Sequence, residues 1–96
     1  MAEQKEENVD LTHLNWIKEI YERTKLEYDE AEKAYFVACM ITHGLDRESQ
    51  EYDTCYVREI KCDERARGLN KKLTMIRGQL FAAEWSYERS LQPAQE

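Results

Sequence analysis

Apolar and small residues recur at alternating intervals of three and four residues through most of this chain. That spacing places side chains along one stripe of an α-helix. In the first half the stripe consists of Leu14, Ile17, Tyr21, Thr24, Tyr28, Ala31, Tyr35, Ala38 and Thr42. In the second half it consists of Tyr52, Cys55, Glu59, Cys62, Ala66, Leu69, Leu73, Ile76, Leu80, Ala83, Tyr87 and Ser90. A heptad pattern this long predicts two long helices packed side by side.

The break between the stripes carries turn chemistry. Gly44 can adopt the left-handed backbone conformation that often ends a helix, and Asp46 can cap the start of the next helix. We therefore expect helices over about 11–43 and about 47–91, and a connection this short makes them antiparallel neighbours. The predicted fold is all-α, a long antiparallel helical hairpin. The expected organisation is an acidic tail over 1–10, a hairpin domain over 11–92 and a polar tail over 93–96.

The position of the turn predicts a register in which facing residues have numbers that sum to about 94. Glu59 then becomes the one acid on the inner stripe. A buried carboxylate needs a partner, so we expect it to bond the Tyr35 hydroxyl, Arg58 or water. The layers predicted by this register include Ile17 with Ile76, Tyr28 with Ala66, and Tyr35 with Glu59.

Gly68 offers an alternative in which the second helix breaks at Gly68–Asn70 and the chain forms a three-helix bundle. Two features favour the unbroken helix. The heptad phase continues through this segment without a skip, and a helix starting at Asn70 would open with Lys71 and Lys72, which are cations at the unfavourable end.

More apolar side chains are present than one stripe can bury, and the second helix is expected to overhang the first by about three turns. Apolar residues off the stripe at both ends of a hairpin are typical of an interface. We expect self-association, with two hairpins pairing into a four-helix bundle. The residues predicted to carry it are Trp16, Ile20, Phe36, Met40, Tyr56, Phe81 and Trp85.

The net charge of −6 disfavours general binding to nucleic acid or to anionic membranes. The charge is uneven, because residues 1–33 carry ten acids and five bases whereas 58–77 carries seven bases and three acids. The basic span is expected to lie alongside the acids of the first helix, which would neutralise it. Its candidate anion-binding residues are Arg58, Lys61, Arg65 and Lys72.

No stretch has the roughly 20 apolar residues of a membrane span, and the chain does not open like a signal peptide. The three cysteines form no Cys-x-x-Cys pair, so we expect free thiols and a cytoplasmic location. His13 and His43 stand at opposite ends of the first helix, and neither belongs to a Glu-x-x-His pair, because no glutamate lies three residues before it. We therefore expect no metal, no cofactor and no enzymatic activity.

These patterns favour a non-enzymatic helical module that binds itself and another protein. One alternative is a small acidic antagonist, of the kind that phages and mobile elements encode, occupying a basic site on a nucleic-acid-handling or defence protein. The other is an oligomeric binder of an anionic small molecule such as a nucleotide, held by the basic span.

Overall fold

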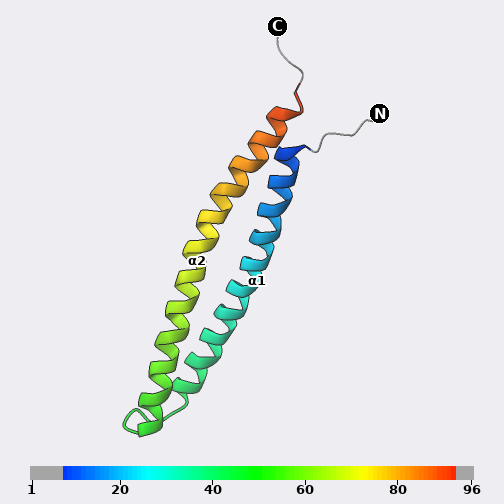
Figure 1. Cartoon of the computed structure of the whole chain (residues 1–96). Helices are drawn as coiled ribbons and strands as arrows, with labels where there is room; N and C mark the ends of the chain where they lie inside the picture. The colour runs from blue at the N-terminus through cyan, green and yellow to red at the C-terminus, as the bar shows by residue number, and fades with distance from the viewer. Residues whose placement is uncertain (1–7, 93–96) are drawn as a thin grey trace.

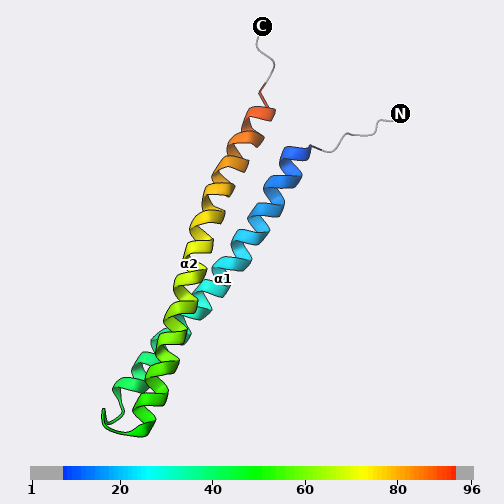
Figure 2. The same cartoon turned by 60° about the vertical axis from the view of Figure 1, so that its left-hand side comes forward.

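Two long helices lie side by side and antiparallel in the computed structural model, which describes residues 8–92 (Figure 1). Helix α1 runs over Val9–His43 and helix α2 over Gln50–Ser90. The molecule is an elongated, flattened rod with extents of about 74 × 29 × 13 Å. Figure 2 shows the two helices crossing at a small angle near the turn. The predicted all-α hairpin is confirmed.

The seam between the helices follows the two predicted stripes, whose residues are buried or half-buried except for Ser90. A hydrophobic cluster of Leu14, Ile17, Ile76 and Ala83 closes the seam at the end that holds the termini, which we call the far end. The heptad spacing therefore identified the buried face of both helices correctly.

The register is also close to the predicted one. Ile17 and Ile76 share the hydrophobic cluster, and Tyr28 and Ala66 line the same groove. The charge of Glu59 acts on the Tyr35 hydroxyl. These layers agree with facing residues whose numbers sum to about 94.

Helix α1 begins at Val9, earlier than expected, because Asn8 caps it. The Asn8 side-chain oxygen accepts a hydrogen bond of 3.2 Å from the Leu11 amide. Helix α2 then has 41 residues against 35 in α1, so it exceeds α1 by only about 9 Å at 1.5 Å per residue. The expected three-turn overhang is wrong, and Tyr87 packs against the far-end cluster. Residues 1–7 and 93–96 of the predicted tails lie outside the described residues.

The predicted end of the first helix is right in position but wrong in conformation. Gly44 has φ −84° and ψ −2°, which is right-handed backbone that any residue adopts. Its amide donates to the carbonyls of Met40 and Ile41 at 3.2 and 3.1 Å. The α1 end is therefore closed by these bonds and requires no glycine.

The cap predicted for the second helix is wrong as well. The Asp46 carboxylate accepts from the Glu48 amide at 3.1 Å, which forms a turn inside the loop. The residue that caps α2 is Ser49, whose hydroxyl accepts from the Tyr52 amide at 3.1 Å. Helix α2 consequently starts at Gln50 and not near 47.

The three-helix alternative is wrong, because α2 passes through Gly68 without a break. Ala66 and Leu73 are buried and Leu69 is half-buried, so the seam continues on both sides of the glycine. Within residues 8–92, neither helix has the length of apolar sequence needed to cross a bilayer.

The two turn positions should respond differently to alanine. Ser49→Ala removes the cap of α2 and should lower the free energy of unfolding by about 1 kcal/mol. Gly44→Ala should leave it unchanged or raise it by about 0.5 kcal/mol, because an added Cβ meets only ordinary contacts at 3.6 Å. Urea denaturation followed by circular dichroism measures both. A loss for Gly44→Ala as large as that for Ser49→Ala would contradict this account of the turn.

Candidate interaction surface

The side chains that fill the seam near the turn are small or polar. Ala38 and Thr42 are buried on α1, and the Thr42 hydroxyl donates to the Ala38 carbonyl at 2.9 Å. Cys55 and Glu59 are half-buried on the facing stripe of α2. No large aliphatic side chain is fully buried here, in contrast to the far-end cluster.

The large apolar side chains at the turn point outward instead. Phe36 is 65% exposed and Met40 is 60% exposed. The rings of Tyr52 and Tyr56 stack with centroids 6.0 Å apart. We call the exposed apolar residues of this end the turn-end patch; it consists of Phe36, Val37, Met40, Ile41, Tyr56, Val57 and Ile60. This end of the molecule is therefore inverted, with small residues inside and large apolar residues outside.

A second group of exposed apolar residues lies at the far end. Trp16 and Trp85 are more than half exposed, and Phe81 is more exposed still. The His13 ring lies 6.0 Å from that of Trp16, and the Arg89 guanidinium lies 4.8 Å from the centre of the Trp85 ring. We call Trp16, Met75, Phe81 and Trp85 the far-end patch.

The balance of burial is unusual for a folded chain. Among residues 8–92, the fully buried apolar residues are four alanines and four large aliphatics, whereas fifteen large apolar residues are exposed. A monomer of this size gains little from such a core. The exposed residues, apart from Leu26, lie toward the two ends of the hairpin.

The seven residues predicted for self-association do not share one side of the hairpin. Ile20 is half-buried against the far-end cluster, and the other six are exposed. Trp16 lies over a groove with Gln79 and Ser86, on the side of the seam that Ile20 also borders. Phe36 borders a hollow that also contains Glu32, which faces the opposite side of the seam. The hairpin thus presents two separate apolar surfaces.

Neither of the two side chains expected to pair with Glu59, Tyr35 and Arg58, forms a hydrogen bond or ion pair with it among the described residues. The Oε1 atom of Glu59 is buried and has no hydrogen-bond partner among the described residues. The pKa of Tyr35 is raised, chiefly by the neighbouring Cys39 side chain and also by the charges of Asp63 and Glu59. One oxygen of the half-buried Glu59 side chain is therefore left without a partner in the seam.

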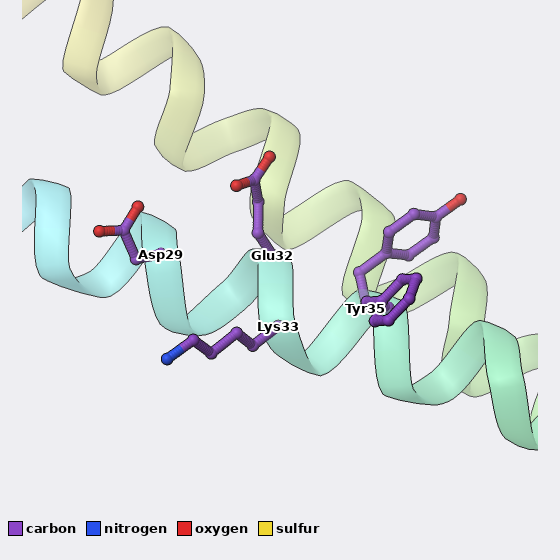
Figure 3. Close-up of a pocket in the computed structure, with 5 residues that line it drawn as sticks. Asp29, Glu32, Lys33 and Tyr35 are labelled. Carbon is purple, nitrogen blue, oxygen red and sulfur yellow. The ribbon is translucent and has the colours of Figure 1, made fainter.

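A shallow hollow on α1 is lined by Asp29, Glu32, Lys33, Tyr35 and Phe36 (Figure 3). All five residues come from one helix, and Figure 3 shows Lys33 extending away from Glu32. The Tyr28 hydroxyl donates to Glu32 at 2.7 Å, which raises the pKa of Tyr28. The hollow is the surface of a single helix and has the shape of a contact region, not of an enclosed ligand site.

The basic span is exposed and forms no ion pair with α1 among the described residues. The candidate anion-binding residues Arg58, Lys61, Arg65 and Lys72 are all exposed. The one ion pair within residues 8–92 joins Asp63 and Arg67 of the same helix at 3.1 Å. The basic span lies alongside α1, as expected, but within residues 8–92 no ion pair joins it to the acids of that helix.

Thiols and metal ligands are dispersed along the rod. Cys39, Cys55 and Cys62 are free and half-buried. In the part of the chain that the structure describes, no three His, Cys, Asp or Glu side chains are grouped so that they could hold a metal ion. The exposed apolar patches, and not a chemical centre, are the features from which a function can be inferred.

No protein-family model, curated protein or solved structure matches this chain.

The unpaired Glu59 carboxylate should cost stability. Glu59→Leu removes a buried unpaired group and extends the apolar seam, so it should raise the free energy of unfolding by about 1 to 2 kcal/mol. Glu64→Leu, at an exposed position one turn away, is the control and should change it by less than about 0.5 kcal/mol. Urea denaturation at neutral pH measures both. A destabilised Glu59→Leu variant would mean that this carboxylate is satisfied.

Proposed function

We propose that this protein is a non-enzymatic helical interaction module that associates with itself and binds a partner protein. The main support for the proposal is the turn end, where large apolar side chains lie outside and small ones lie inside. Phe36, Met40 and Val57 face solvent there although the seam beside them is filled by small and polar residues. A sequence selected only for a stable monomer would gain by exchanging the two sets of residues.

The energetics support association. Fully burying one large apolar side chain stabilises by roughly 1.5 to 3 kcal/mol. The turn-end patch alone has seven such side chains, whereas the whole hairpin fully buries four large aliphatic ones. Contacts between molecules can thus contribute as much stabilisation as the seam does.

The middle of the rod supports specific association over aggregation. The exposed residues between the two patches are mostly charged, as at Glu19, Glu22 and Lys25 on α1. Charges of both signs on the surface, with a net charge of −6, disfavour contact along the whole length. Association is then directed to the ends and to complementary charge patterns.

The turn-end patch is wide enough for two different contacts. Phe36 and Val37 are consecutive, so their side chains point about 100° apart around the helix axis. An interface that covers Val37 leaves Phe36 exposed on the other side of the seam. This arrangement supports a module in which one side of the hairpin self-associates and the other binds a partner protein.

Self-association predicts a particle mass of at least twice the 11.5 kDa of the chain. Val37→Glu, which places a charge in the turn-end patch, should lower the mass measured by size-exclusion chromatography with light scattering. Gln50→Glu adds the same charge at the exposed start of α2 and should leave the mass unchanged. A wild-type chain that remains monomeric at tens of micromolar would overturn the proposal.

Partner binding is tested with Phe36→Glu. A tagged wild-type chain should capture a protein from its native host that the Phe36→Glu chain does not capture, while the mass of the variant by light scattering stays that of wild type. Equal recovery by both baits would show that the Phe36 side of the turn-end patch is not the binding surface.

A further inference from the structure

Helix α1 carries a second stripe of residues, away from the seam. Trp16, Arg23, Glu30 and Val37 are spaced by seven residues, or about two helical turns, so they share one face. All four are exposed, Trp16 by 57% and Val37 by 53%. We call these four residues the outer stripe. Trp16 contacts His13 and borders a groove with α2, but none of the four residues is buried in the seam.

The outer stripe is complementary to the same stripe of a second copy that runs in the opposite direction. From the N-terminal end it reads apolar, positive, negative, apolar. In an antiparallel second copy, Trp16 meets Val37 and Arg23 meets Glu30, and the two-fold symmetry makes each contact twice. A parallel copy would instead set Arg23 against Arg23 and Glu30 against Glu30. The charge order therefore favours the antiparallel arrangement.

The row beside the outer stripe has the same symmetry. Glu19, Leu26 and Lys33 are also exposed and spaced by seven. The antiparallel pairing that joins Arg23 to Glu30 places Glu19 opposite Lys33 and Leu26 opposite itself, on the two-fold axis. Leu26 is 65% exposed in the charged middle of α1, where the seam gives it no role. A leucine at the centre of a helix pair has an apolar partner there.

A third row of α1 lies on the opposite side of the outer stripe from Leu26, and its apolar residues also face each other in the antiparallel pair. It contains Ile20, Glu27 and Ala34, and the same pairing sets Ile20 against Ala34. Glu27 meets its own copy at this edge, one turn from Arg23 of its own helix.

The charges of the stripe are available for such a contact. The ion pair Asp63–Arg67 is the one present between residues 8 and 92, so Arg23, Glu30, Glu19 and Lys33 have no ionic partner in their own hairpin. From Trp16 to Val37 the stripe extends over about 31 Å at 1.5 Å per residue. That is three heptads, enough for a helix pair with a defined register.

We propose that two copies of this chain pair through α1, antiparallel about Leu26, with their turns at opposite ends of the assembly. This inference deepens the proposed self-association and rests on it. The two helices α2 then lie outside the pair, and the Phe36 sides of the two turn-end patches stay exposed at opposite ends. The assembly therefore binds two partner molecules, one at each end.

Charge reversal tests the pairing. Arg23→Glu places like charges together at two symmetric contacts and should weaken the dimer at least roughly tenfold at low salt. The double variant Arg23→Glu, Glu30→Arg restores both contacts in reversed order and should return the dissociation constant to within about threefold of wild type. Lys25→Glu changes the same charge on α1 off the stripe and is the control. Sedimentation equilibrium measures all four chains, and circular dichroism verifies that each is helical.

The outcomes separate this inference from the proposed function. A monomeric wild type overturns both. A dimeric wild type whose double variant stays as weak as Arg23→Glu overturns the antiparallel pairing while self-association stands. With the native cysteines replaced by serine, Leu26→Cys should crosslink to its own copy through a short bismaleimide. Val37→Cys should not, because its copies lie about 33 Å apart. Crosslinking of Val37→Cys as well as Leu26→Cys would instead establish a parallel dimer, in which every residue of α1 meets its own copy.

Discussion

Burial along a single helix–helix seam is the constraint from which the other features of this molecule follow. With only two helices, each can bury one stripe, and every other side chain faces solvent or another molecule. The seam is strongest at the far end, where Leu14, Ile17 and Ile76 meet, and weakest near the turn, where Ala38 and Thr42 replace large side chains. The stability of the chain is therefore unevenly distributed along the rod.

This uneven distribution connects the fold to the proposed function. The turn end contributes little apolar burial to its own hairpin, holds the unpaired Glu59, and exposes seven large apolar residues. The side chains that would stabilise this end by packing inward are the ones available to a partner. Stability and recognition thus compete for the same residues, and at the turn the exposed arrangement is the one present.

The charged side chains contribute little to the seam and are available for contacts between molecules. Within the described chain the two helices approach through apolar and small side chains, and the single ion pair stays inside α2. The remaining charges are free to define which surfaces meet and in which direction. On α1 their order along the outer stripe distinguishes an antiparallel second copy from a parallel one, which apolar residues alone could not do.

Much of this structure was determined by the sequence itself. Heptad spacing predicted both helices, their seam and their register, because periodic burial is a property that each helix carries in its own residue order. The caps were not determined in this way, since Asp46 and Ser49 are both good caps and only the path of the loop selects Ser49. Nor was the missing partner of the Glu59 Oε1 atom. It depends on distances across the seam, which exist only once the two helices are packed.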